Sequence, residues 1–333
     1  IKTKTKIYVG LYHIHVKLKI NNFDWVNIKN ISTILPMAII TLTTDFGEKD
    51  YFAGATKGAI YSELPDVKIV DISHSVSPFN IPEAAYIIQN AYNSFPKGTI
   101  HIIGIDSEIN PENKHIGIKL DDHYFICANN GIMSMICSEI APEKIVEINI
   151  HDKIQTSFPV LDVFVKVACH IARGGTLEVI GKSISEIKPI KNIVPYVNDD
   201  KTQIVGSIVY IDNYGNVVTN IKRQFFETIQ KGRDFEISAR NYTFKKIHDK
   251  YSDIVNFEIP ENKRQDEGRK LVVFNSGNFL EIAVYKSNSA TIGSASTLLG
   301  LGLMDAVSIN FIPKPIVPKR LEIQQNATKA ADY

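Results

Sequence analysis

The chain has 333 residues, a length that suits two domains of ~100–200 residues each. Hydrophobic residues make up 44% of it and charged residues 22%, which excludes a chain that is disordered throughout. Lysine and arginine number 37 against 36 aspartates and glutamates, and this formal charge of +1 argues against a nucleic acid or an anionic membrane as partner.

The first 36 residues carry six lysines against one aspartate, and we expect residues 1–36 to be an N-terminal extension outside the fold. No apolar run approaches the ~20 residues that a membrane helix needs. Three cysteines, Cys127, Cys137 and Cys169, form an odd count without the spacing of a metal site. They predict small buried side chains in a reducing compartment, and hence a cytoplasmic protein.

From Met37 onward, short apolar strands alternate with amphipathic helices. Strands are expected at 38–44, 67–72 and 99–105, with helices at 51–63 and 82–95 between them. A hairpin and two further helices follow, at 116–128, 130–138 and 162–173. This alternation predicts an α/β domain over residues 37–185, with a Rossmann-like, mostly parallel sheet flanked by helices.

The pattern changes after about residue 185. Residues 186–200 are rich in Lys, Pro and Asn and are interpreted as a linker. Beyond them we expect strands only, at 204–211, 217–221, 235–238, 271–274, 279–285 and 306–311. Turn sequences separate these strands, which favours an antiparallel β-barrel domain over 201–312, followed by a C-terminal tail at 313–333.

Two aspartates, Asp45 and Asp106, follow predicted strands at the sheet edge where open α/β folds bind ligands. A carboxylate there can grip a ribose diol or orient a water, but aspartate also commonly caps a turn. The loop 44–48 has no glycine-rich phosphate cradle, which favours a nucleoside-like ligand without phosphates. The scattered histidines lack the pairing of a helical metal site, so no metal is expected.

Six motifs then occur in a fixed order along the chain. They are ITLTTDFG at 40–47, IVDISHSVSP at 69–78, FPKG at 95–98, NNG at 129–131, IDNYGNVVTN at 211–220 and NSGNFLEIA at 275–283. Together they resemble the S-adenosyl-L-methionine (SAM) hydrolase family, also called SAM hydroxide adenosyltransferase, whose relatives include fluorinases and chlorinases. The resemblance covers residues 37–311 and implies an N-terminal α/β domain followed by a β-barrel.

The resemblance also implies an assembly and a reaction. The assembly is a homotrimer whose active sites lie between one subunit's α/β domain and its neighbour's barrel. The reaction is displacement by water at the ribose C5′ of SAM, which gives adenosine and L-methionine. SAM is then a small-molecule substrate, and no cofactor or metal is implied because the sulfonium is already a good leaving group.

The resemblance assigns substrate contacts on both domains. Asp45 matches the ribose-binding aspartate, while Asp50 and Asp212 match acidic positions that hold the methionine ammonium. Phe79 falls where the family has an aromatic wall beside the substrate. Two carboxylates suit an ammonium, and an aromatic ring offers a flat apolar face.

Three barrel residues complete the implied substrate set. Asn216 matches an adenine-binding amide, with Tyr214 beside it as a stacking candidate. Ser276 matches a contact to the methionine carboxylate, and Gly277 stands where the fluorinase has an arginine. An amide carries both a donor and an acceptor for a purine edge.

The water site departs from the family pattern. Family hydrolases use an aspartate, an arginine and a histidine there; Asp106 matches the first, but Asn113 and Pro159 occupy the other two positions. One interpretation is a hydrolase whose rearranged water site uses Asp106 with Lys114 or a nearby histidine such as His115. The alternative is a non-catalytic SAM- or adenosine-binding protein that has lost the water-activating residues. Another nucleophile or nucleoside substrate is a third possibility.

Overall fold

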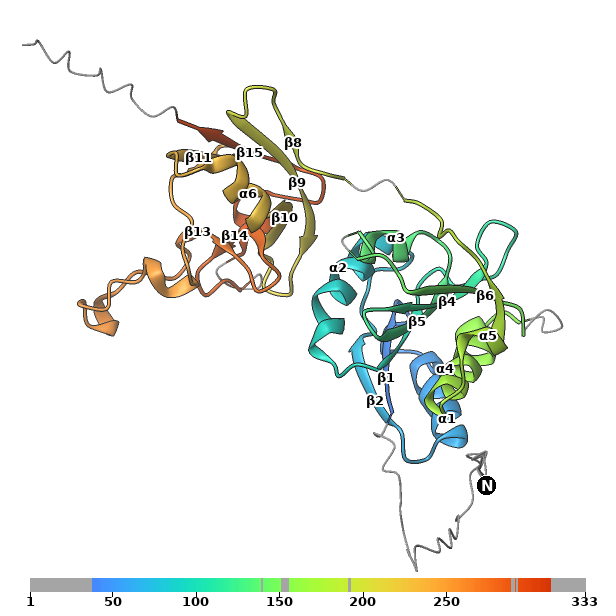
Figure 1. Ribbon diagram of the computed structural model, residues 1–333. Coiled ribbons are helices and arrows are strands. Elements are labelled where there is room, and N and C mark those ends of the chain that lie inside the picture. The colour runs from blue at the N-terminus through green and yellow to red at the C-terminus, as the bar shows by residue number, and fades with distance from the viewer. Residues whose placement is uncertain are drawn as a thin grey trace, which may run out of the picture.

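The computed structural model of the chain describes residues 38–138, 140–150, 156–190, 193–288, 291 and 293–312. The extension predicted for residues 1–36 and the tail predicted for 313–333 lie outside the described residues. Figure 1 shows two units, an α/β unit in blue to green and a β-barrel unit in yellow to red. Within the described ranges, no helix is long and apolar enough to cross a membrane.

The α/β unit is built on a seven-stranded mixed sheet with the order β2-β1-β3-β5-β4-β6-β7. Its parallel half consists of β2 (Lys68–Ser73), β1 (Ile39–Thr44), β3 (Ile100–Gly104) and β5 (His123–Ala128). Its antiparallel half consists of β4 (His115–Leu120), β6 (Lys144–Ile148) and β7 (Gly181–Ser183). Side chains buried on both faces of β1 and β3 explain their near-continuous apolar sequences.

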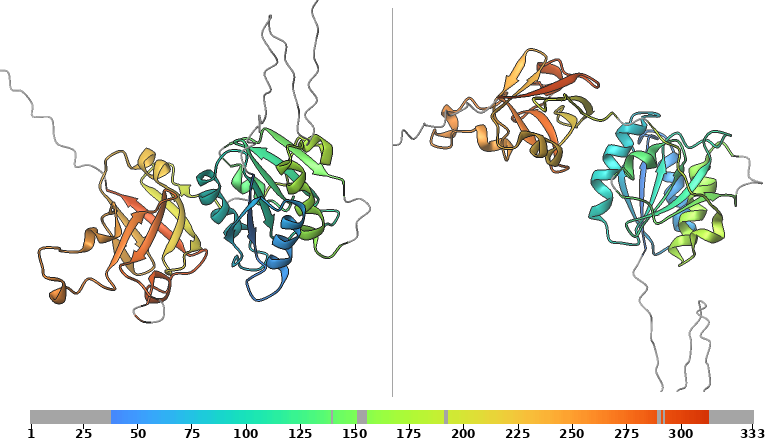
Figure 2. Two further views of the ribbon diagram at one scale, coloured as in Figure 1. Left: turned by 90° about the horizontal axis from the view of Figure 1, so that it is seen from below. Right: turned by 45° about the horizontal axis from the view of Figure 1, so that its top comes forward.

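Helices cover both faces of this sheet (Figure 2). One face packs against α1 (Phe52–Glu63), a π-helical turn (Val160–Phe164), α4 (Val165–Ala172) and α5 (Leu177–Ile180). The other packs against α2 (Ile81–Ala91), the short 3₁₀ turn Tyr92–Ser94 and α3 (Ile132–Ile136). Asn80 caps α2 by accepting the Glu83 N–H, and Pro82 lies in its first turn, as expected at a helix start.

The second unit is a nearly closed antiparallel barrel with the strand order β12-β11-β15-β9-β10-β14-β13. Its strands are β9 (Gln203–Ile211), β10 (Val217–Lys222), β11 (Phe235–Ala239), β12 (Tyr242–Phe244), β13 (Lys270–Phe274), β14 (Phe279–Val284) and β15 (Ala306–Phe311). Between β12 and β13, residues 245–269 extend outward as an orange arm in Figures 1 and 2. We call this segment the arm.

The predicted fold class, an α/β unit followed by a β-barrel, is confirmed. Three details differ. The first sheet is mixed rather than mostly parallel. A short strand inside the predicted linker, β8 (Tyr196–Val197), pairs with β9. The barrel also contains two helices, α6 (Arg223–Gln230) and α7 (Ala295–Leu298), where only strands were expected.

Helix α2 joins the two units. The Tyr86 ring stacks on Tyr210 of β9 with a centroid distance of 4.3 Å, and also contacts Phe279 at 5.5 Å. Its hydroxyl accepts a hydrogen bond of 3.2 Å from Asn275 Nδ2, in the turn before β14. The helix that covers the first sheet therefore also reaches a loop of the barrel.

Candidate functional site

Asp45 lies at the carboxyl end of β1, where the buried strand leaves the sheet. Its Oδ2 accepts the backbone N–H of Phe79 at 2.9 Å, which joins the loop after β1 to the loop after β2. Partial burial raises the pKa of Asp45, and the nearby charge of Asp106 raises it further, although the Phe79 N–H bond opposes this. Asp45 and Asp106 thus both lie at the carboxyl edge of the sheet, just after the paired parallel strands β1 and β3.

Two of the predicted site residues have strained backbones. Phe79 has a φ of +62° and Asp106 a φ of +41°, both in the left-handed region that non-glycine residues rarely adopt. The Phe79 ring is also 71% exposed, although aromatic rings usually bury their surface. Such strain clusters at functional sites because the surrounding fold has to hold it in place.

The turn that carries Asp106 is fixed by the NNG motif. Asn130 Nδ2 donates to the carbonyl of Ile105 at 2.9 Å and to that of Asp106 at 3.3 Å. His115 Nε2 donates to the Ser107 carbonyl at 2.9 Å, which closes the loop from its other end. The role of Asn130 was missed by sequence reasoning, although the motif itself was recognised.

Pro159, which the resemblance places at the histidine position of the family hydrolases, is buried beside an aromatic cluster. Phe46 and Phe158 meet edge to face at 5.5 Å. Gly104 at the end of β3 leaves space there, because a Cβ at Gly104 would lie 3.0 Å from Val160 and 3.2 Å from Phe46. This side of the Asp106 turn is therefore an apolar wall.

The loop after Asp106 is held by a lysine that sequence reasoning did not single out. Lys188, in the predicted linker, donates from Nζ to Asn113 Oδ1 at 2.9 Å, and its own N–H bonds to Asn129 Oδ1. Lys114 is exposed and accepts the Asn129 N–H through its main-chain oxygen. Among the described residues, no hydrogen bond or ion pair joins the Lys114 side chain to Asp106.

A buried histidine supports the loop that carries Asp45. His74 Nδ1 lies 2.7 Å from Thr44 Oγ1, and Nε2 lies 3.1 Å from Asp71 Oδ1. The His74 carbonyl accepts the Gly47 N–H at 2.7 Å. Asp50, by contrast, is exposed beyond this loop, and no hydrogen bond or ion pair to it occurs in the described part of the chain.

The barrel presents the remaining predicted residues on two turns. In the first, Asp212 Oδ1 accepts the N–H groups of Tyr214 at 2.9 Å and Asn216 at 2.8 Å, and Oδ2 accepts Asn216 Nδ2 at 3.1 Å. Tyr214 is 64% exposed. Gly215, at a φ of +75°, allows this tight turn, since a Cβ there would overlap Ser294.

The second turn carries Ser276. Asn275 Oδ1 accepts the N–H groups of Gly277 at 3.0 Å and Phe279 at 3.1 Å, so the exposed Ser276 lies on a fixed loop. Both turns border one cavity of about 490 Å³, whose polar lining residues are Tyr86, Asp212, Asp249, Lys250, Tyr251, Asn275, Ser276 and Glu281. Tyr86, Tyr251 and Glu281 were missed by sequence reasoning.

This barrel cavity is acidic and partly buried. Glu281 is 2% exposed, and burial raises the pKa of its carboxyl. Burial likewise raises the pKa of Tyr86 to about 12, so this phenol is neutral and able to donate at physiological pH. The acidic side chains outnumber the one lysine in the lining, which favours a ligand that carries positive charge. In the part of the chain that the structure describes, no group of three or more His, Cys, Asp or Glu side chains is arranged to hold a metal ion.

The predicted site residues thus form two groups. Asp45, Phe79 and Asp106 lie at the sheet edge, whereas Asp212, Tyr214, Asn216 and Ser276 lie on the barrel. No hydrogen bond or ion pair between the described residues connects one group directly to the other. We call them the sheet half-site and the barrel half-site.

Comparison with known proteins matches both units. Family models described as SAM hydroxide adenosyltransferase N-terminal domain and C-terminal domain match residues 40–181 and 206–308. A Methanocaldococcus jannaschii protein named (R)-S-adenosyl-L-methionine hydrolase is 29% identical over 282 residues, covering 81% of this chain and 95% of the relative. A protein from Actinopolyspora mzabensis named fluorinase is 22% identical over 278 residues, covering 74% of this chain and 90% of the relative.

Solved structures agree on the fold. A conserved protein from Thermotoga maritima superposes with a TM-score of 0.69 at 28% identity, covering 82% of this chain and all of that chain. A conserved protein from Thermus thermophilus superposes with a TM-score of 0.60 at 19% identity, which supports the fold alone. Both matches extend over the two units.

Proposed function

The chain belongs to the SAM hydroxide adenosyltransferase family, and we propose that it hydrolyses SAM to adenosine and L-methionine. In this reaction a water oxygen forms a bond to the ribose C5′ while the C5′–S bond breaks. The electron pair of that bond stays on sulfur, which becomes the neutral thioether of methionine, and the water releases one proton.

The observation that supports this proposal best is the joint retention of both half-sites. Asp45 is held by the Phe79 N–H, and we assign its carboxylate to the ribose diol and the exposed Phe79 ring to the apolar wall beside the substrate. On the barrel, Asp212 borders the cavity, and we assign it to the ammonium. We assign Asn216 to a purine edge, for which its buried amide has to exchange its bond to Asp212 for one to the base. We assign Tyr214 to stacking, Ser276 to the methionine carboxylate and Asp50 to the ammonium.

We assign Asp106 to the attacking water, whose proton a carboxylate can accept or orient. The apolar wall of Phe46, Phe158 and Val160 limits hydration beside it, which favours a nucleophile with few competing water contacts. We assign Lys114, on the same loop, to balance the charge near Asp106. Since the sulfonium is already activated, alignment of water with the C–S bond is the main task of the protein.

We further propose a homotrimer in which the sheet half-site of one subunit meets the barrel half-site of its neighbour. The family resemblance and the division of the predicted residues between two units both support this arrangement. The proposed reaction uses SAM as substrate and no cofactor or metal. Three free cysteines suit the reducing cytoplasm.

One observation favours a second function, the binding of SAM or adenosine without turnover. Pro159 supplies no polar side-chain group, and the apolar wall surrounds it. Loss of a group that positions or activates water costs about 10²–10⁴ in rate. A binding protein would keep both half-sites and show no product.

The test is incubation of the purified full chain with SAM, followed by chromatography for adenosine and methionine over hours. We expect equal amounts of both products over many turnovers. Asp45→Asn should reduce turnover by about 10²-fold or more, because the ribose loses its charged partner. Asp66→Asn, in an exposed turn, is the matched control and should leave the turnover of SAM unchanged. Intact SAM binding without product would instead support the binding protein.

A further inference from the structure

Glu281 is a buried carboxylate that the proposed reaction does not use. It lies in β14, where every residue from Phe279 to Val284 is buried, and its side chain borders the barrel cavity. Glu281 is 2% exposed, and burying a carboxyl group to this degree costs folding free energy unless its oxygens are hydrogen-bonded. Its hydrogen bonds therefore indicate what this residue organises.

The two carboxyl oxygens of Glu281 serve different segments. Oε1 accepts the hydroxyl of Tyr251, in the arm, at 2.8 Å. Oε2 accepts Asn275 Nδ2 at 3.1 Å, and a weaker interaction with the Asn216 amide opposes the rise in the pKa of the carboxyl. Glu281 thus bonds to the arm and to the turn that carries Ser276, and it interacts with the turn that carries Asp212 through Asn216.

Each of these contacts continues to a predicted substrate residue. Asn275 bonds Glu281 through its amide nitrogen and fixes the Ser276 turn through its oxygen. Asn216 is bonded to Asp212, the carboxylate assigned to the ammonium. Movement of Glu281 would therefore displace the contacts to both charged groups of an amino-acid ligand.

We propose that Glu281, with Tyr251, is the positioning residue of the barrel half-site and sets the spacing of Asp212 and Ser276 for the amino-acid end of SAM. This inference rests on the proposed function, because it names what orders the substrate contacts of that site. Glu281 acts through Asn275 and Asn216 and does not itself react.

The substitutions separate hydrogen bonding from charge. Glu281→Gln keeps one acceptor for Asn275 Nδ2, and the Tyr251 hydroxyl can rotate to accept from the new amide, so the connections persist. Glu281→Ala removes them and leaves Asn275 and Tyr251 without this partner. Tyr251→Phe removes only the bond from the arm.

We expect Glu281→Ala to raise the KM for SAM about tenfold or more while kcat changes less than about threefold, since misplaced turns weaken binding rather than water attack. Glu281→Gln should stay within about threefold of the wild-type KM, and Tyr251→Phe should raise KM about threefold with an unchanged Tm. Glu236→Ala, a partly exposed glutamate in β11 of the same barrel, is the matched control and should change neither constant.

Binding of SAM, measured by calorimetry, keeps this inference distinct from the proposed reaction. If the wild type binds SAM without hydrolysing it, the proposed hydrolysis fails, but the order of the four Kd values still tests Glu281. A Tm loss in Glu281→Ala with wild-type KM and Kd would overturn the positioning role. If Glu281→Ala does not fold, the other two variants decide. Wild-type SAM affinity in Tyr251→Phe, together with strongly weakened SAM binding by Glu281→Gln, would also overturn the positioning role.

Discussion

At the scale of single residues, two buried histidines make the α/β unit sensitive to acid. His101 Nδ1 lies 2.7 Å from Thr41 Oγ1, and His101 Nε2 lies 3.1 Å from His123 Nδ1. Burial, together with the neighbouring His123, lowers the pKa of His101 to about 3, and burial also lowers the pKa of His123. Both rings are therefore neutral in the folded protein at physiological pH.

Unfolding exposes these histidines, which then titrate near their ordinary pKa of about 6.5. Below that pH the unfolded chain binds protons that the folded chain does not, so stability present above about pH 6.5 is lost as the pH falls toward 3. We expect the free energy of unfolding to fall by up to about 1.4 kcal/mol per pH unit for His101 in this window, and His123 adds a loss of the same sign.

His101→Gln should flatten this dependence, although it lowers stability at neutral pH. His170→Gln, on α4, replaces a histidine outside this pair and serves as the control for the substitution itself. Urea unfolding between pH 7 and 4 measures both slopes. Equal slopes for the wild type and His101→Gln would contradict the assignment.

The sequence indicated some residues of the two proposed half-sites and not others, for physical reasons. Asp45 and Asp106 were predictable because strand ends of an open sheet share one edge. Glu281 looked like an ordinary strand residue, since its role depends on hydrogen bonds to Tyr251, 30 positions away in sequence. Lys188 was hidden in a polar segment, because only the folded chain places it on Asn113.

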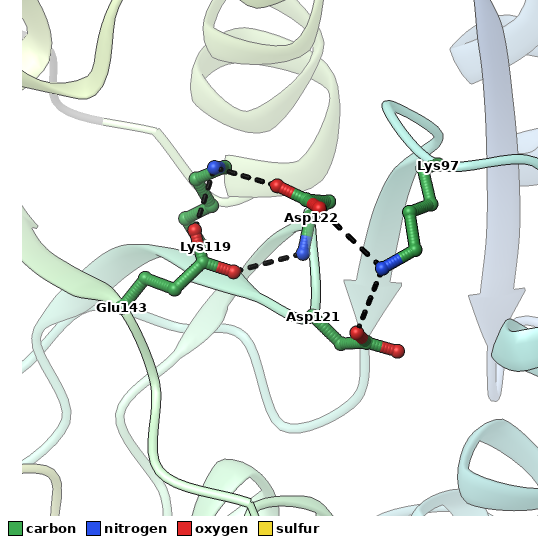
Figure 3. Close-up of polar contacts among 5 residues, drawn as sticks. All are labelled: Lys97, Lys119, Asp121, Asp122 and Glu143. Carbon is green, nitrogen blue, oxygen red and sulfur yellow. Dashed lines mark hydrogen bonds and ion pairs between the residues drawn. The ribbon is translucent and has the colours of Figure 1, made fainter.

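At the scale of elements, the hairpin β4–β5 shows how a turn and its ion pairs combine. Asp121 and Asp122 both have positive φ, at 48° and 60°, as in the tight hairpin turns that suit the twist of paired strands. Figure 3 shows their carboxylates beside lysines: Lys97 Nζ lies 3.0 Å from Asp121 Oδ1, and Lys119 Nζ lies 2.9 Å from Asp122 Oδ1. Glu143 contacts Lys119 at 2.6 Å and also accepts the Asp122 N–H.

Because these groups are partly or fully exposed, the network should add little stability. We expect Lys119→Met to lower Tm by no more than about 3 °C at low salt, and the difference to shrink in roughly 1 M salt. Lys166→Met, on an exposed position of α4, provides the control. A Tm loss that stays the same at both salt concentrations would contradict a screened surface network.

The predicted elements were most accurate where apolar periodicity was strong. The strands β1 and β3 and the hairpin β4–β5 were found nearly at their observed bounds. Helix α6 was missed because Phe225 and Phe226 are adjacent aromatic residues, a pattern typical of strands, and no capping side chain marks its start. Strand β7 has only three residues, Gly181–Ser183, without an apolar pattern.

At the scale of the whole molecule, the family assignment made from six ordered motifs is confirmed by matches to both units. The two half-sites lie on different units that meet through Tyr86 and Tyr210. The proposed trimer joins the sheet half-site of one subunit to the barrel half-site of another. Sequence alone does not give this pairing, because it depends on surfaces formed by folding.

Mixed subunits test the shared site. Asp45→Asn damages one half-site and Asp212→Asn the other, so each variant alone should be nearly inactive. After the two are mixed, dissociated and reassembled, about one quarter of the sites in a trimer should combine two intact halves. Recovered activity near that fraction is expected, whereas no recovery would place each complete site within one subunit.

The most direct measurement for the central claim is hydrolysis of SAM in heavy-oxygen water, with mass spectrometry of both products. Attack by water at the ribose C5′ predicts adenosine that carries the heavy oxygen in its 5′-hydroxyl and methionine that carries none. Unlabelled adenosine, or the absence of adenosine above a sample without protein, would contradict hydrolysis at C5′.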